Sequence, residues 1–103
     1  MIKWVATVKR PPAMAVEELR GWWLRKHALI AKRLPGLKKY VVSLTLAIGE
    51  EEPKYDGIAE LWFDSVDDLK KALDSPVFAE LRNDIDEHKI IVTRMFTEEH
   101  FIV

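Results

Sequence analysis

The stretch WLRKHALIAKRLPGLKKY, residues 23–40, predicts the second half of an amphipathic helix, a sharp turn and the start of a strand. The helix is expected to extend from Val16 to about Arg33, because apolar residues recur there at steps of three or four along one face. Gly21 weakens this helix by about 1 kcal/mol relative to alanine, and a close packing contact is one explanation for its presence. The apolar face consists of Val16, Leu19, Trp23, His27, Ile30 and Leu34.

The turn at Leu34-Pro35-Gly36 ends the helix, since proline disfavours helical geometry in the residue before it and glycine permits a turn. A long strand is then predicted over Lys38 to Ile48. One row of its side chains is bulky and apolar and the other is smaller and more polar, so we expect both faces of this strand to be covered. An exposed acidic hairpin loop is expected over residues 49–54.

The remaining segments show similar alternation and helix signals. Residues 84–87 are expected to form an acidic connection, and Phe101-Ile102-Val103 is expected to dock on a neighbouring strand. We predict strands over Ile2–Val8, Ile58–Phe63 and Lys89–Thr97, and helices over Val66–Leu73 and Val77 to about Asn83.

The predicted order of elements, βαββαβ, indicates an α+β, ferredoxin-like fold with two helices on one face of a four-stranded antiparallel sheet. We expect a single domain over residues 1–103, because no linker or low-complexity segment interrupts this order. The opposite face of the sheet is also too apolar for water. Two such sheets that close face to face would hide it and form a dimeric α+β barrel around a pocket.

The composition excludes several classes of protein. The net charge is −1, with 16 basic and 17 acidic residues, so the basic surface of a nucleic-acid-binding protein is missing. The absence of cysteine excludes disulfides, thiolate catalysis and cysteine metal sites. No stretch matches a signal peptide or the roughly 20 apolar residues of a membrane span. We therefore expect a soluble, cytoplasmic protein with no membrane partner.

Motifs for common cofactors are also missing. The three histidines, His27, His88 and His100, do not have the spacing of zinc ligands. There is no glycine-rich phosphate loop and no GxSxG elbow. We therefore expect neither a metal nor another cofactor, and acid–base chemistry is what remains.

His27 is the strongest candidate for such chemistry, since histidine titrates near neutral pH and this one lies on an apolar helix face. Tyr40 can donate a hydrogen bond to a developing oxyanion. Glu60, Asp84 or Asp86 could orient the histidine or act as a second base. Glu60 stands in an apolar row of its strand, so its carboxylate must lie at an edge, in an ion pair or in a polar cavity. Taken alone, each of these residues fits a structural role better than a catalytic one.

An ordered set of short motifs runs through nearly the whole chain. The motifs are Trp23-x-x-x-His27, Leu34-Pro35-Gly36-Leu37, Lys38-Lys39-Tyr40, the run YDGIAELWF over residues 55–63, Ser75-Pro76, Asp86-Glu87 and Thr97-Glu98-Glu99-His100. This set resembles the EthD family, which is named after a protein of ethyl tert-butyl ether degradation. The resemblance implies a homodimeric α+β barrel with a cavity for a hydrophobic small molecule between the sheet and the first helix.

The resemblance also implies which residues form the site. The histidine and tyrosine implicated in the pocket of isomerase-like members match His27 and Tyr40, which become the predicted catalytic residues. The cysteine associated with the isomerase has no counterpart, because this chain has no cysteine. The predicted ligand-binding residues are Trp23, Glu60, Trp62 and Asp86.

The function implied is that of a small-molecule-binding protein or a cofactor-independent enzyme acting on a hydrophobic oxygenated metabolite, such as a lactone, a phenol or a polyketide fragment. Related proteins include a methylmuconolactone isomerase and fungal polyketide dehydratases or decarboxylases, and the wider superfamily includes cofactor-free monooxygenases. The reaction class therefore stays open between isomerase, lyase and cofactor-free oxidoreductase. Two alternatives are a non-catalytic accessory module for a neighbouring oxygenase and a structural dimer with a filled lumen.

Overall fold

The computed structural model describes all residues, 1–103, as four strands and one layer of helices in the order predicted. The segment between the first two strands comprises two α-helical pieces joined by a π-helical turn, η1 (Trp23–His27). The other elements are β1 (Ile2–Lys9), α1 (Val16–Trp22), α2 (Ala28–Ala31), β2 (Lys39–Leu44), β3 (Gly57–Phe63), α3 (Val66–Leu73), α4 (Pro76–His88) and β4 (Ile91–Glu98).

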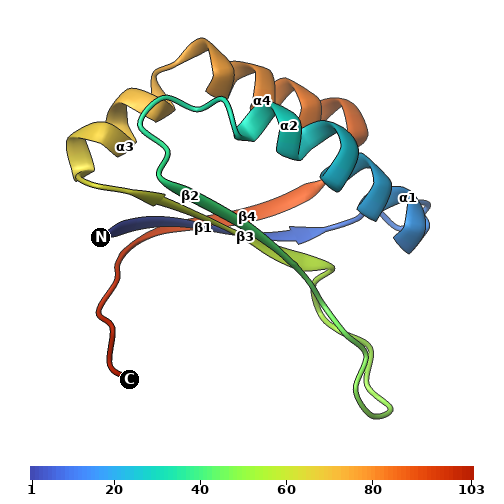
Figure 1. Ribbon diagram of the computed structural model, residues 1–103. Helices are drawn as coiled ribbons and strands as arrows, with labels where there is room; N and C mark the ends of the chain where they lie inside the picture. The colour runs from blue at the N-terminus through green and yellow to red at the C-terminus, as the bar shows by residue number, and fades with distance from the viewer.

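The four strands form one antiparallel sheet in the order β2-β3-β1-β4, with all helices on one face (Figure 1). Trp4 at the centre of β1 pairs with Leu61 of β3 on one side and with Phe96 of β4 on the other. The predicted α+β, ferredoxin-like fold is therefore confirmed. None of its helices combines the length and the apolar character needed to cross a bilayer.

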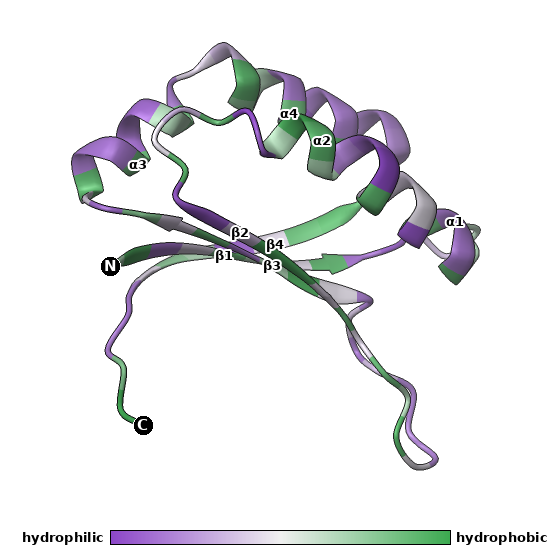
Figure 2. Cartoon of the chain, viewed as in Figure 1, coloured by the Kyte–Doolittle hydropathy of each residue, from purple (hydrophilic) through white to green (hydrophobic).

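The core lies between the helices and the sheet. Trp23, Leu19 and Phe63 are its largest fully buried side chains, and burying a leucine or phenylalanine side chain contributes roughly 1.5–3 kcal/mol. The helices carry hydrophilic residues over much of their outer surface, as Figure 2 shows. The buried members on the sheet are Trp4, Ala6, Val8, Ala59, Leu61 and Phe63.

Helix α4 is longer than predicted, because residues 84–87 form its last turns and not an acidic connection. The helix begins at a serine cap, where the Ser75 hydroxyl accepts the Phe78 N–H at 3.3 Å. It continues because Leu81 and Asp84 are both buried on its inner face. It ends at Lys89, whose φ of 57° is left-handed.

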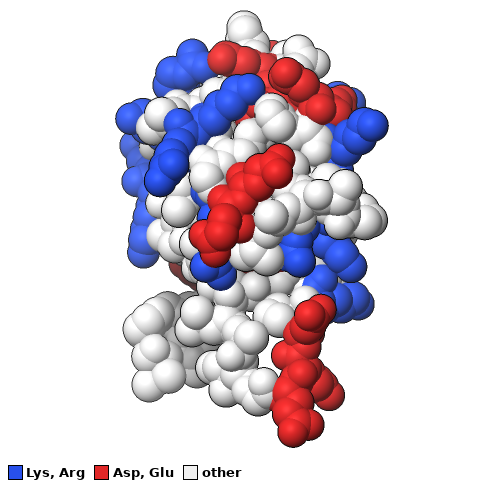
Figure 3. All heavy atoms as spheres, turned by 90° about the vertical axis from the view of Figure 1, so that its right-hand side faces the viewer, with Lys and Arg blue, Asp and Glu red and all other residues white.

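The predicted strand from Lys38 to Ile48 is also wrong in its second half, since β2 ends at Leu44. Leu44 pairs with Gly57, the first residue of β3, so no strand partner is left for the residues beyond it. Residues 45–56 instead form a hairpin arm that projects from the body (Figure 1). Figure 3 shows acidic side chains gathered at the lower end of the molecule, and Glu50, Glu51 and Glu52 are exposed as expected.

Two apolar segments that the sequence predicted to be covered are exposed to solvent in the structure of the single chain. Leu46 and Ile48 on the hairpin arm are 74% and 85% exposed. The terminal triplet Phe101-Ile102-Val103 is also almost fully exposed and docks on no strand of the chain. These side chains, together with the uncovered face of the sheet, leave apolar surface that folding of one chain does not hide.

Gly21 is not explained by a close packing contact, because a Cβ built there meets no atom within 4 Å. We expect Gly21→Ala to raise the free energy of unfolding by about 0.5–1 kcal/mol, since alanine favours the helix and restricts the unfolded chain. Urea unfolding followed by circular dichroism measures this. Gly36→Ala is the matched control and should destabilise, because the φ of Gly36 is 75°.

Candidate active site

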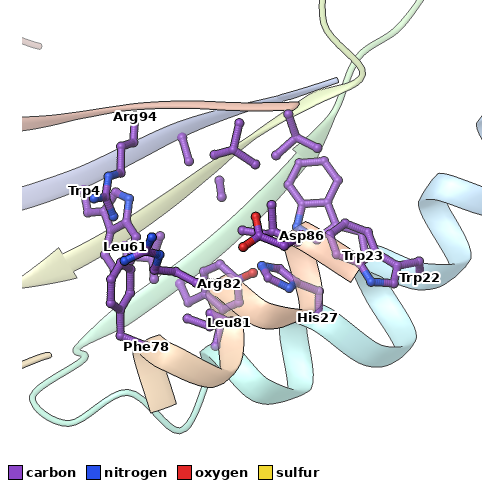
Figure 4. Close-up of a pocket in the computed structure, with 17 residues that line it drawn as sticks. Trp4, Trp22, Trp23, His27, Leu61, Phe78, Leu81, Arg82, Asp86 and Arg94 are labelled. Atoms are coloured by element: carbon purple, nitrogen blue, oxygen red, sulfur yellow. The ribbon is translucent and has the colours of Figure 1, made fainter. Parts of the chain in front are cut away.

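A cavity of about 200 Å³ lies between the helices and the sheet, on the face that the helices cover (Figure 4). Of its 17 lining residues, 13 are hydrophobic. A dry cavity of about 150 Å³ holds benzene, so this space suits a molecule with one small ring. The other four lining residues are His27, Arg82, Asp86 and Arg94, and Tyr40 among the hydrophobic ones adds a phenol hydroxyl.

The π-helical turn η1 determines how the helix presents itself to this cavity. A π-helical turn bonds each residue to the fifth along the chain, so it inserts an extra residue into the helical repeat. Trp22 and Trp23, three and four residues after the buried Leu19, are both buried and both line the cavity, ahead of His27 at the end of the turn. Such turns occur often at functional sites.

His27 is held by a buried carboxylate on the neighbouring helix. Its Nδ1 lies 2.9 Å from Oδ2 of Asp84, whose side chain is 3% exposed. The ionised carboxylate can only accept, so Nδ1–H donates and Nε2 of this cavity-lining residue carries the free lone pair. Trp22 stacks on the imidazole with ring centroids 4.6 Å apart and fixes its plane.

The two groups of this pair have shifted ionisation. Burial lowers the pKa of His27 and outweighs the opposing hydrogen bond to Asp84. Burial alone would raise the pKa of Asp84, but the bonds from His27 and Lys26 outweigh it and hold that pKa below its usual range. Lys26 Nζ lies 3.0 Å from Oδ1 of Asp84. At neutral pH the site therefore holds a neutral imidazole beside a carboxylate, the state that a general base requires.

Tyr40 reaches the same cavity from β2. Burial raises the pKa of Tyr40, partly opposed by the indole N–H of Trp23, so the phenol keeps its proton at neutral pH. A protonated phenol in a largely apolar cavity can donate a hydrogen bond to a developing oxyanion.

Trp23 lies against the backbone of Gly57, which allows the helix to approach the sheet closely. A Cβ at Gly57 would be 2.5 Å from Trp23 Cζ3 and 2.6 Å from the carbonyl oxygen of Ser43. We expect Gly57→Ala to lower the free energy of unfolding by about 1–3 kcal/mol, the usual cost of overpacking. Urea unfolding measures this, with Gly21→Ala as the control in which the same added methyl group stabilises.

Four of the six predicted site residues come together. Trp23, His27, Tyr40 and Asp86 all line the cavity. The exposed side chain of Asp86 has no bond to His27, so among the three candidate carboxylates it is Asp84 that orients the histidine.

Glu60 and Trp62 lie elsewhere, because the structure does not bring them to the cavity that His27 lines. They share the outer row of β3, on the sheet face opposite the helices. The carboxylate of Glu60 is paired with Lys3 at 2.9 Å, as expected for a charge in an apolar row. The indole of Trp62 donates to Glu99 at 3.0 Å.

Sequence reasoning did not single out Trp22, Arg82 or Arg94 as site residues, although all three line the cavity. Arg94 had a detectable signal, because it stands between Val92 and Phe96 in the apolar row of its strand. Trp22 also had a signal, since it lies three residues after Leu19 and therefore on the same side of the helix.

One cluster has donor atoms that resemble metal ligands, but its electrostatics do not suit a cation. The ligand atoms of Asp84, Glu87 and His88 lie within 4.8 Å of one another. The ammonium of Lys26 already contacts Asp84 at 3.0 Å and Glu87 at 4.0 Å. A positive charge therefore occupies the place where a metal would bind.

The sheet, the one-sided helical layer and the cavity between them define a ferredoxin-like α+β protein with a largely apolar, small-molecule-sized pocket beside its first helix. The sequence matches the EthD domain over residues 11–89. The chain belongs to the EthD family, as its motifs predicted. No curated protein matched the sequence.

Solved structures share the fold at low sequence identity. An ethyl tert-butyl ether degradation (EthD) family protein from Bacillus halodurans has a TM-score of 0.85 at 22% identity, covering 97% of this chain and 99% of that one. A dimeric protein of unknown function and ferredoxin-like fold from Bacteroides fragilis has a TM-score of 0.69 at 22% identity, covering 95% of each chain. SnoaB from Streptomyces nogalater, a cofactor-independent oxygenase, has a TM-score of 0.69 at 16% identity, covering 99% and 95%.

Proposed function

We propose that this protein is a cofactor-independent acid–base enzyme that acts on a small, largely apolar, oxygenated molecule. The observation that carries the proposal is the Asp84–His27 pair, which directs a neutral imidazole into an apolar cavity. The cavity also argues against the alternative of a structural dimer with a filled lumen.

In the proposed reaction, Nε2 of His27 removes a proton from a carbon next to a carbonyl group. The C–H electron pair moves into the carbonyl, and the resulting enolate oxygen accepts a hydrogen bond from Tyr40. Asp84 stabilises the imidazolium that forms. Return of the proton to another carbon gives an isomerase, and loss of a neighbouring leaving group gives a lyase. The structural likeness to the cofactor-independent oxygenase keeps a third outcome open, in which the carbanion reacts with O₂.

Hydrogen–deuterium exchange tests this proposal without knowledge of the product. Small lactones, phenols and ketones would first be screened by thermal shift, because a ligand of the folded state raises apparent stability. Molecules that bind would then be incubated with the protein in D₂O and examined by NMR. Loss of the C–H signal next to the carbonyl is the expected result. Binding without exchange would favour the alternative of a non-catalytic accessory module.

We also propose that the protein is a homodimer through the outer face of its sheet. Val5 and Met95 are paired there, and Met95 is 54% exposed. The exposed side chains of the hairpin arm and the terminal triplet add further apolar surface. The B. fragilis relative of the same fold is described as dimeric.

A charge on this face is expected to dissociate the dimer. Met95→Lys should convert the protein to a monomer at micromolar concentration, because each subunit would bury an unpaired ammonium group in the interface. Leu29→Lys is the matched control, since Leu29 is 49% exposed on the opposite, helical side. Size-exclusion chromatography with light scattering measures the masses. A dimer that survives Met95→Lys, or dissociates equally with Leu29→Lys, would contradict the proposed interface.

A further inference from the structure

The cavity has a cationic end and an imidazole end. Arg82 of α4 and Arg94 of β4 both flank the ring of Phe78, with their guanidinium carbons 6.0 Å and 5.1 Å from its centroid. Figure 4 shows both side chains reaching toward Trp4 and Phe78, whereas His27 lies toward the opposite end beside Trp22 and Trp23. Two positive charges therefore converge on one end of a largely apolar space.

Neither guanidinium has a counter-charge within the chain. Arg82 and Arg94 form no ion pair within 4.0 Å and no hydrogen bond, whereas Arg10 and Arg33 are paired with carboxylates. The only acidic residue lining the cavity is Asp86, and it contacts neither arginine within that distance. The stabilising contacts that these guanidiniums do make are with aromatic rings.

The position of Arg94 distinguishes it from an ordinary surface charge. It occupies the helix-facing row of β4, where the paired residue on β1 is the buried Ala6. Its guanidinium lies within 6 Å of the ring centroids of Trp4, Phe78 and Phe96. These rings hold the positive charge at the edge of the cavity, where the side chain of Arg94 is still reached by solvent.

We propose that the molecule bound in this cavity carries a carboxylate, which Arg82 and Arg94 hold while its apolar body extends toward His27. This inference rests on the proposed function and names the class of its substrate. The planar guanidinium matches a carboxylate with two parallel hydrogen bonds. Leu61 and Leu81 form part of the apolar lining. A volume of about 200 Å³ restricts the molecule to one small ring or a short chain.

Matched pairs of neutral and anionic probes test this inference. Benzoate and cyclohexanecarboxylate would be compared with benzamide and cyclohexanecarboxamide, which have the same shape without the charge. Binding to the full chain is followed by tryptophan fluorescence, because Trp4, Trp22 and Trp23 line the cavity. We expect the carboxylates to bind about ten-fold more tightly than the amides, or better, since hydrogen bonds between charged groups are the stronger ones.

Three variants test whether carboxylate binding depends on the arginine pair itself or only on the net charge of the protein. Arg82→Gln and Arg94→Gln are each expected to weaken carboxylate binding by about ten-fold and to leave amide binding within about two-fold. Arg25→Gln is the control, because Arg25 is exposed and outside the cavity. If Arg94→Gln does not fold, the binding measured for Arg82→Gln alone tests the inference. Arg82 is an exposed residue of α4, so this substitution is expected to leave the fold intact.

The possible results of these binding measurements separate failure of the carboxylate site from failure of the proposed function. Amides that bind as tightly as carboxylates, or an equal loss in all three variants, would overturn the carboxylate site and leave an acid–base pocket intact. Failure of both probe series to bind at millimolar concentration would overturn the proposed pocket function together with this inference.

Discussion

Replacing His27 by glutamine should slow exchange of the substrate C–H by about 10²–10⁴-fold, the usual contribution of a positioned general base. Glutamine keeps a polar side chain in the cavity but has no basic nitrogen. The dissociation constant for the ligand should stay within about three-fold, because the cavity walls are unchanged. NMR in D₂O measures the exchange rate, and fluorescence titration measures the binding.

The pH dependence of the exchange rate should report the titration of the same residue, His27. Burial lowers the pKa of His27, so the neutral base persists below the ordinary histidine pKa of about 6.5. The wild-type rate is expected to be constant at neutral pH and to fall as pH decreases through that lowered pKa. The residual rate of His27→Gln should lack this step.

His88 provides a matched control for His27. Its Nδ1 lies 2.8 Å from the backbone carbonyl oxygen of Asp84, and Trp22 lies beside both histidine rings. His88 does not line the cavity, so His88→Gln should retain nearly the full exchange rate. An unchanged rate in His27→Gln, or an equal loss in His88→Gln, would reject the assignment of the base.

Periodic patterns made much of the fold predictable. The helix–turn–strand of residues 23–40 depends on local signals, namely an apolar row and the breaker Pro35-Gly36, and it was recovered from the sequence. The π-helical turn was not predicted, because one inserted residue hardly disturbs that apolar row. In addition, the residues that bury Trp22 and Trp23 come from other elements. The end of β2 was missed for a similar reason: apolar alternation continues to Ile48, but its strand partner does not.

The site was only partly predictable because burial of charge depends on tertiary partners. The run of acidic residues over 84–87 is hydrophilic in sequence, yet Asp84 is buried by contacts with His27 and Lys26 of another helix. Glu60 and Trp62 were assigned to the ligand, but both lie on the row of β3 that the helices do not cover. The sequence of the strand does not say which row the helices will cover.

Asp84→Asn is expected to reduce the exchange rate by about 10²–10⁴-fold although residue 84 does not line the cavity. The amide can present its NH₂ group to Nδ1 of His27. That arrangement selects the tautomer with the proton on Nε2, which removes the base from the cavity. The variant also lacks the negative charge that stabilises the imidazolium.

The same change should lower stability in a pH-dependent way. Burial opposes ionisation of Asp84, but its hydrogen bonds hold the pKa below that of the unfolded chain. The stability contributed by this carboxylate is therefore present above the unfolded pKa of about 3.9 and is lost as pH falls through the lower folded pKa. At pH 7 we expect Asp84→Asn to cost about 1–3 kcal/mol, and this difference should shrink in acid.

Glu87→Gln serves as the control for Asp84→Asn, because Glu87 is an exposed carboxylate on the same helix that also faces Lys26. It should leave both the exchange rate and the free energy of unfolding near their wild-type values. The decisive comparison is between catalysis and folding for Asp84→Asn at pH 7. A purely structural Asp84 would lower stability but leave the exchange rate of the folded fraction intact, whereas an orienting carboxylate must lower that rate in fully folded protein.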